Sequence, residues 1–253
     1  MKKGLFKLVL AISVLALAAM ACGLATPGGS DGPVDVFPPT VDSGGSGGTG
    51  GNGGDAPQPT NVPPSNNNGR PLMEDDFRGR DSNWGVGTDA DSSVEYVDDA
   101  LKFVVNATNY FVWSTPGDVD YSNIHIEVTV ANSSADSNSA FGIMCNQQFM
   151  DDEFYYAYIT PSGDYGIVKS MFVDDDVDLA TGFSDLIPQN AASYTLGMDC
   201  GNGSISLYVN GQLIDTGFDT DYPSGGIALF AWSDEMQNGV TVSFDDFSVT
   251  ELK

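Results

Sequence analysis

The chain has 253 residues, with 9 lysines and arginines against 35 aspartates and glutamates, so its formal net charge is −26 at pH 7. This charge argues against nucleic acid or an anionic membrane surface as a partner, because both would repel the protein. Hydrophobic residues make up 41% of the chain, which excludes disorder throughout. A single histidine and three cysteines exclude zinc fingers and most histidine-dependent nucleophile triads.

Residues 1–21 have the composition of an export signal. Lysines stand near its start, and an uncharged apolar run then extends from Leu8 to Ala21. This run is shorter than the roughly 20 residues that span a membrane. The sequence therefore predicts an extracytoplasmic protein whose signal peptide is cleaved before Cys22.

The residues Ala21-Cys22-Gly23 resemble the end of a bacterial lipobox, in which the cysteine receives a lipid. Ala19 stands where leucine is usual in that motif. A flexible segment follows the cysteine directly, as an anchor requires. We expect a lipid on Cys22 that attaches the protein to the bacterial cell membrane. The alternative is a chance cysteine beside an ordinary secretory cleavage site.

Residues 22–70 form a linker by composition. Between residues 26 and 70 there are 12 glycines and 8 prolines, and Phe37 is the only aromatic residue. Such a segment buries too little apolar surface to offset its ordering entropy, so we expect a disordered tether. Its stretch Gly48–Gly53 matches the dinucleotide-binding pattern G-x-G-x-x-G, but neither a strand nor a helix is predicted beside it. We attribute the match to glycine richness.

Residues 71–253 alternate short apolar segments with turn residues. The clearest strand covers residues 124–130, where isoleucine and valine alternate with polar residues. The same alternation predicts strands over residues 101–105, 110–114, 139–146, 154–160, 165–169, 194–200, 204–209, 226–232 and 240–249. No segment has the spacing of a long amphipathic helix. These features predict an all-β domain, built as a two-sheet antiparallel sandwich.

Two short segments predict tight turns between strands. Asn210-Gly211 is the stronger of the two, because a type I′ hairpin turn requires positive φ at both central positions. Pro161–Asp164 has the composition of a second hairpin turn.

Cys145 and Cys200 share the parity of apolar residues in their strands, which places both side chains in the core. In an exported protein two such thiols oxidise to a disulfide. We predict this pairing. The alternative is a pair of buried free thiols.

Four motifs carry a resemblance to a known superfamily. They are Asp75-Asp76-Phe77 with Trp84, Tyr155–Ile159 with Gly163-Asp164-Tyr165, Leu207–Gly211, and Phe244–Phe247. In this order they resemble the concanavalin A-like lectin/glucanase superfamily, nearest to laminin-G-like and 3-keto-disaccharide-hydrolase-like modules of bacterial surface lipoproteins. The resemblance implies a jelly roll whose first and last strands are adjacent. It implies no particular chemistry, because the fold carries lectins, hydrolases and interaction modules.

The same resemblance implies a structural calcium ion. In many members of the superfamily such an ion ties the opening strand to the closing strand. Here the expected ligands are Asp75, Asp76, Asp245 and Asp246. Their hard carboxylate oxygens suit calcium.

Catalytic residues are not expected. Glucanases of the superfamily often carry E-x-D-x-x-E on one strand, and Glu74-Asp75-Asp76 begins this pattern but reaches Gly79 at the position of the second glutamate. We expect His125 beside Glu127 on the solvated face of its strand, which makes it no candidate base. The many aspartates keep a glycoside hydrolase open as an alternative.

The favoured function is a non-catalytic glycan-binding module. Sugars have flat C–H faces that stack on aromatic rings, and a tyrosine hydroxyl is costly to bury unpaired, which favours a tyrosine cluster on a wet surface. The expected ligand-binding side chains are Tyr156, Tyr158, Tyr165, Tyr208 and Trp232. By contrast, we assign to the core Phe141, Phe154, Phe230 and Phe244. The alternatives are rings that only fill the core, or an adhesion or scaffold module that binds a surface protein.

Overall fold

The computed structural model describes residues 69–79, 82–148, 153–171, 174–233 and 239–252. The chain divides into two compact units, Met1–Pro63 and Pro64–Lys253, and all described residues belong to the second. Among them no helix is long and apolar enough to cross a membrane. The predicted signal peptide, Cys22 and nearly all of the tether lie outside the described residues.

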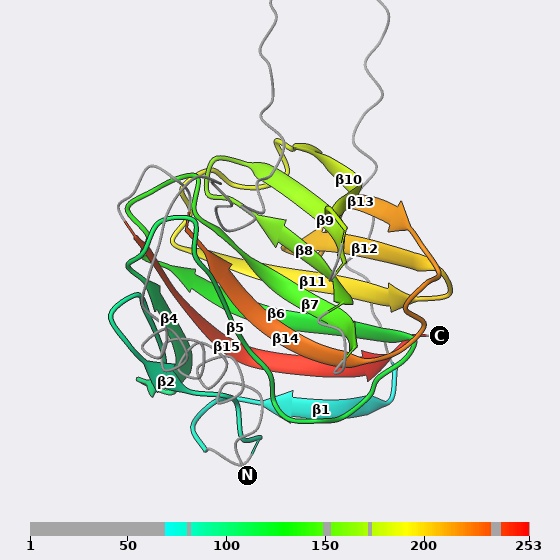
Figure 1. Cartoon of the computed structure of the whole chain (residues 1–253), viewed down its shortest axis with the longest axis horizontal. Helices are drawn as coiled ribbons and strands as arrows, with labels where there is room; N and C mark the ends of the chain where they lie inside the picture. Colours follow the sequence, from blue (N-terminus) through cyan, green and yellow to red (C-terminus); the bar gives the residue numbers. More distant parts are fainter. Residues whose placement is uncertain (1–68, 80–81, 149–152, 172–173, 234–238, 253) are drawn as a thin grey trace, which may run out of the picture. The chain divides into compact units, whose positions relative to one another are not determined.

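The described residues form two antiparallel sheets that lie one over the other (Figure 1). The nine-stranded sheet has the order β13 (Gln212–Phe218), β12 (Ser204–Val209), β11 (Ser193–Gly201), β6 (Ile124–Asn132), β15 (Val240–Glu251), β4 (Ala100–Val105), β3 (Ser92–Val97) and β2 (Gly87–Thr88), with β1 (Pro71–Asp75) paired to β15. The six-stranded sheet has the order β10 (Val177–Phe183), β9 (Asp164–Ser170), β8 (Glu153–Ile159), β7 (Ala140–Gln148), β14 (Gly226–Trp232) and β5 (Phe111–Ser114). This architecture confirms the predicted all-β sandwich.

Local sequence explains much of the strand order. Asn210 and Gly211 have φ angles of 50° and 75°, which confirms the predicted hairpin turn between β12 and β13. Gly163, with φ of 104°, turns the chain from β8 into β9. The opening strand β1 pairs with the closing strand β15, as the jelly-roll resemblance implied. The alternation of apolar and polar residues did not predict strands β1, β2, β3 and β10, and only the resemblance implied the opening strand β1.

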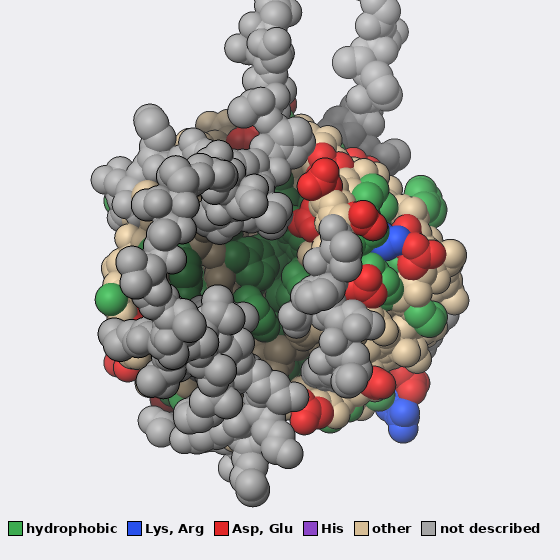
Figure 2. Space-filling view, in the orientation of Figure 1, with side chains coloured by type: hydrophobic (Ala, Val, Ile, Leu, Met, Phe, Trp, Pro, Cys, Tyr) green, Lys and Arg blue, Asp and Glu red, His purple; other side chains and the backbone are tan. Residues whose placement is uncertain are grey.

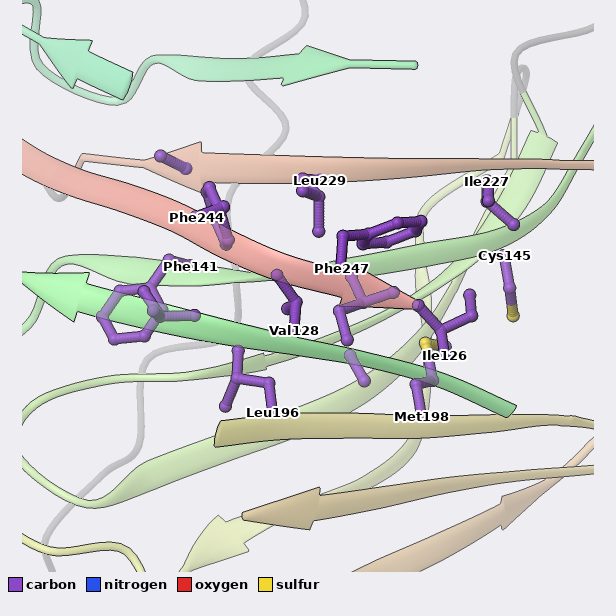
Figure 3. Packing of buried hydrophobic residues seen from close by; sticks show 14 of the residues in the cluster. Ile126, Val128, Phe141, Cys145, Leu196, Met198, Ile227, Leu229, Phe244 and Phe247 are labelled. Atoms are coloured by element: carbon purple, nitrogen blue, oxygen red, sulfur yellow. The ribbon is translucent and has the colours of Figure 1, made fainter. Parts of the chain in front are cut away.

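The core lies between the two sheets and is built by the inward residues of both. Ile126 and Val128 of β6 belong to the same buried cluster as Phe141 and Leu229 of the opposite sheet, and Figure 3 shows these side chains in the layer between the sheets. These four side chains are 0% exposed. Burying an aliphatic or aromatic side chain of this size contributes about 1.5–3 kcal/mol, so this layer holds the sheets together.

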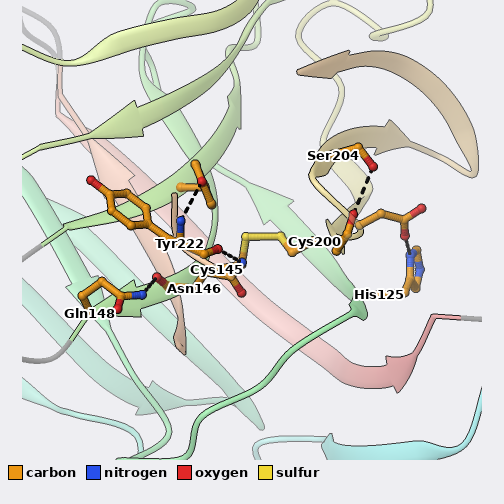
Figure 4. Close-up of a disulfide and its surroundings, with 10 residues drawn as sticks. His125, Cys145, Asn146, Gln148, Cys200, Ser204 and Tyr222 are labelled. Carbon is orange, nitrogen blue, oxygen red and sulfur yellow. Dashed lines mark hydrogen bonds and ion pairs between the residues drawn. A yellow bond between two sulfur atoms is a disulfide. The ribbon is translucent and has the colours of Figure 1, made fainter. Parts of the chain in front are cut away.

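A disulfide joins the two sheets through their inner faces. Cys145 of β7 and Cys200 of β11 lie 6.5 Å apart between Cα atoms and 55 residues apart in sequence, and their sulfurs are bonded (Figure 4). Both cysteines are fully buried. The predicted pairing is confirmed.

The segment that follows β13 is bound to the six-stranded sheet by polar contacts around the buried Lys169. The Lys169 ammonium contacts the carboxylates of Asp219, at 3.3 Å, and Asp221. The Tyr155 hydroxyl donates to Asp219 and accepts a hydrogen bond from the Tyr222 amide at 3.1 Å. Lys169 is 6% exposed, and these acids offset the cost of burying its charge.

The expectation that the His125 side chain is solvated was wrong. It lies on the outward face of the nine-stranded sheet, as parity predicted, but it is only 7% exposed. Its Nδ1 lies 2.6 Å from Asp199 Oδ1, and the Tyr208 ring covers it edge-on at 6.0 Å. Burial alone lowers the pKa of His125, but the carboxylates of Asp199 and Glu127 outweigh it and raise the pKa to about 9.

Candidate functional site

The outward side of the six-stranded sheet carries a cluster of apolar side chains, here called the aromatic face. Strand alternation sends every second residue of β5, β14, β7 and β8 to this side. The members of the aromatic face are Phe111, Trp113, Met144, Phe154, Tyr156, Tyr158, Ala228 and Phe230. Figure 2 shows hydrophobic side chains gathered at the centre of the molecule's face, with acidic side chains toward the edge that carries β10. This cluster is separate from the core between the sheets.

The rings of the aromatic face contact one another across strands. Phe111 and Phe230 stack with centroids 4.7 Å apart and an angle of 23° between planes. Tyr156 meets Phe230 edge-on at 5.7 Å, and Tyr156 and Tyr158 lie nearly parallel at 6.3 Å. Such pairs contribute about 0.5–1.5 kcal/mol beyond their burial, so the rings are held in fixed orientations.

Two glycines make room for these rings. Gly142 and Gly166 are the cross-strand partners of Tyr158 on β7 and β9. A Cβ at Gly166 would lie 2.3 Å from Cε1 of Tyr158. A Cβ at Gly142 would lie 2.0 Å from the backbone oxygen of Ala157 and 2.9 Å from the Phe230 ring. The Tyr158 ring therefore lies over the backbone of its neighbouring strand, which only glycine permits.

The polar groups at the β10 edge of the aromatic face are acidic. The Tyr156 hydroxyl donates to Asp176 Oδ2 at 3.0 Å, and burial together with that carboxylate raises the pKa of Tyr156. Burial, and then the charge of Asp178, also raises the pKa of Tyr158, so both hydroxyls stay protonated at neutral pH. The six strands of this sheet contain one basic residue, Lys169, which has the inward parity of Ile167 and is bound to its acids.

Of the five predicted ligand-binding residues, the structure brings three to one face. Tyr156 and Tyr158 belong to the aromatic face, and Trp232 has the parity of its member Phe230. Tyr165 does not belong there, because it packs against the core and donates to Asp215 Oδ2 at 2.7 Å. Tyr208 lies on the other sheet, where it donates to Asp199 Oδ2 at 2.8 Å.

Two of the four phenylalanines assigned to the core, Phe141 and Phe244, lie between the sheets. Phe230 is buried as expected, at 0% exposed, but it lies in the aromatic face, as does the partly buried Phe154. Parity could have found both, because Phe154 alternates in phase with Tyr156 and Phe230 with Trp232. Phe111 and Trp113 of β5 were also missed.

The expected calcium ligands do not converge. Both oxygens of Asp75 accept hydrogen bonds, from the Phe77 amide at 2.8 Å and from Trp84 Nε1 at 2.9 Å. Asp76 and Asp245 each accept from a backbone amide of a following residue, Arg78 and Asp246 respectively. Within the described ranges no three acidic, histidine or cysteine side chains gather as metal ligands would. The residues present do not fit the calcium site that the resemblance implied.

The chain was compared with family models, curated proteins and solved structures, and only solved structures match it. No family model matches the chain, and no curated protein matches it by sequence. A protein of unknown function with a galectin-like fold from Bacillus subtilis aligns with a TM-score of 0.57 and 12% identity, over 72% of this chain and 96% of that one.

Two further structures align as well. A carbohydrate-binding module of Bacillus subtilis gives a TM-score of 0.52 at 15% identity, over 66% of this chain and 95% of that one. The Bacillus licheniformis beta-glucanase gives 0.52 at 13% identity, over 74% of this chain and 100% of that one. At these identities the likeness establishes the fold alone: the described domain is an antiparallel jelly-roll sandwich.

Proposed function

We propose that the aromatic face binds a neutral glycan. The observation that carries this proposal is the set of fixed rings on one side of a single sheet, with tyrosine hydroxyls and acidic groups at its margin. Aromatic planes stack on the C–H faces of sugars, and the margin supplies hydrogen-bond acceptors for hydroxyls. Asp176 and Asp178 repel anionic sugars, and no basic side chain among the outward residues of these six strands offsets them.

We further propose that the glycan is bound without being cleaved. Glycoside hydrolysis requires two carboxyls, about 5–5.5 Å apart in retaining enzymes and 6.5–9.5 Å apart in inverting enzymes. By parity, the outward residues of β5, β14, β7 and β8 include no carboxylate. Among the described strands of this sheet, the outward aspartates are Asp164 of β9 and Asp178 of β10, toward the β10 edge. The fold itself occurs in a carbohydrate-binding module and in a beta-glucanase, so this argument rests on the residues of the face.

Alanine substitutions on the aromatic face test the binding proposal. We expect Tyr158→Ala and Trp232→Ala each to weaken binding about 5- to 30-fold, since each removes one stacking surface worth about 1–2 kcal/mol. The measurement is calorimetric titration with neutral hexasaccharides of gluco, manno, galacto and xylo configuration, and with a carboxymethylated glucan as the anionic comparison.

Tyr208→Phe is the matched control, because Tyr208 lies on the opposite sheet. It should leave sugar affinity unchanged. Absence of binding to every neutral sugar, or equal affinity in Tyr158→Ala and the wild type, would contradict the proposal. The first result would favour the protein-binding adhesion or scaffold alternative.

We also propose that a lipid on Cys22 anchors this domain outside the cytoplasm. The lipobox-like residues before the tether support this assignment. The expected result is that the protein made in a bacterial host partitions into the detergent phase of a Triton X-114 extraction, while Cys22→Ser partitions into the aqueous phase. Equal partitioning of both proteins would leave Cys22 as an ordinary residue near a secretory cleavage site.

A further inference from the structure

Gln147 lies at one end of the aromatic face. The pairing of β7 with β14 shifts register between Met144, the partner of Ala228, and Gln147, the partner of Gly226. Gly226 has the parity of Ala228, so Gln147 points to the same side as Met144. On the β14 side its partner is Gly226, which has no side chain to place beside it. The Gln147 amide therefore lies on the same side of the sheet as the aromatic face, next to Met144 along β7.

The Gln147 amide is buried but its oxygen is unpaired. The residue is 6% exposed, and within the described part of the chain Oε1 has no hydrogen-bond partner. The adjacent Gln148 differs, because its Nε2 donates to the backbone oxygens of Asn146 at 2.7 Å and Ser224 at 2.8 Å (Figure 4 shows the first). A buried acceptor without a partner destabilises the fold, and such groups persist where something else supplies the donor.

The group that donates a hydrogen bond to Gln147 Oε1 is better explained as a sugar hydroxyl than as a metal ion. A cation would need several oxygen ligands, and no three metal-ligating side chains gather anywhere in the described ranges. A sugar hydroxyl can donate to Oε1, and a neighbouring hydroxyl can accept from the amide nitrogen of the same side chain. A sugar ring stacked on the aromatic face would carry its hydroxyls along the edge where Gln147 lies.

Building on the glycan-binding role of the aromatic face, we propose that Gln147 is a specificity-determining residue for the bound sugar. Its Oε1 accepts a hydrogen bond from a hydroxyl of the sugar unit at the Met144 end of the face. A site that pairs a buried polar group with a hydroxyl rejects a sugar that lacks the hydroxyl or carries it in the other orientation, because the amide is then left unpaired. The aromatic face favours neutral over anionic sugars. Gln147 then favours the sugar whose hydroxyl has the orientation that reaches Oε1.

The test is Gln147→Met in the full chain, titrated with the gluco, manno, galacto and xylo hexasaccharides. We expect affinity for the sugar that the wild type prefers to fall about three- to tenfold. The ratio of affinities between epimers should shrink by a similar factor. The melting temperature should stay unchanged or rise, because the variant no longer buries an unpaired acceptor.

Gln148→Met is the matched control on the same strand. It removes two hydrogen bonds to backbone oxygens, so its melting temperature should fall while its selectivity stays that of the wild type. Wild-type affinity and selectivity in Gln147→Met would overturn this assignment and leave the glycan-binding proposal standing. If the wild type binds none of the four sugars, both proposals fail.

Discussion

Replacing Cys145 and Cys200 together with alanine is expected to lower the free energy of unfolding by about 4 kcal/mol. The disulfide closes a loop of 55 residues, and on the chain-entropy account a loop of that length in the unfolded chain gives a stabilisation of this size. The bond also joins β7 to β11 across the core, so its loss removes a covalent link between the sheets. Urea unfolding of the variant and the wild type measures the difference.

Cys22→Ala is the control for this experiment, because it removes a cysteine that takes no part in the bond. It should unfold at the same urea concentration as the wild type. A loss below about 1 kcal/mol in the double variant would show that the disulfide contributes little to stability. Free thiols at positions 145 and 200 in non-reducing mass spectrometry would contradict the pairing itself.

The free energy of unfolding is expected to fall by about 2–3 kcal/mol between pH 6 and pH 9.5. His125 has a pKa of about 9 in the folded protein, against about 6.5 when unfolded. A raised folded-state pKa gives stability that is complete below pH 6.5 and is lost as the pH rises through 9. The chain has one histidine, Cys145 and Cys200 are joined in a disulfide, and aspartate, glutamate, tyrosine and lysine side chains normally titrate outside this window. Urea unfolding at a series of pH values measures the slope.

The variant His125→Gln separates the pH dependence that comes from His125 from that of the other groups in the protein. The variant cannot take up the proton, so its stability should be nearly constant from pH 6 to 9.5. Asp199→Asn should reduce the slope as well, because Asp199 accepts the hydrogen bond from His125 Nδ1. A flat profile in the wild type, or an unchanged slope in His125→Gln, would contradict the assignment.

The fold could be predicted from the sequence because most strands bury one face and solvate the other. In β6, apolar Ile126 and Val128 alternate with Glu127 and Thr129, which identifies both the strand and its inner side. The same alternation placed Cys145 and Cys200 in the core. Exposed edge strands such as β10 were missed, since residues with little burial leave no periodic signal.

The candidate site could be predicted only in part, because the central strands of its sheet are apolar on both sides. Every residue of β14 up to Ala231 is buried, so the apolar pattern does not distinguish its two sides, and only the parity of Phe230 with Trp232 marks Phe230 as outward. The partner of His125 was beyond sequence reasoning for another reason. Asp199 is 74 residues away, and only the register of β6 with β11 brings them together.

Backbone chemical-shift mapping with the preferred neutral hexasaccharide tests the central claim most directly. We expect shifted amide signals to cluster on the aromatic face, at Gly142, Met144, Gly166, Ala228 and Phe230, with the signals of β11 and β12 unmoved. The sugar's own anomeric signals should stay constant over a day, which reports binding without cleavage. Shifts confined to the nine-stranded sheet would contradict the site, and new reducing-end signals would contradict the non-catalytic function.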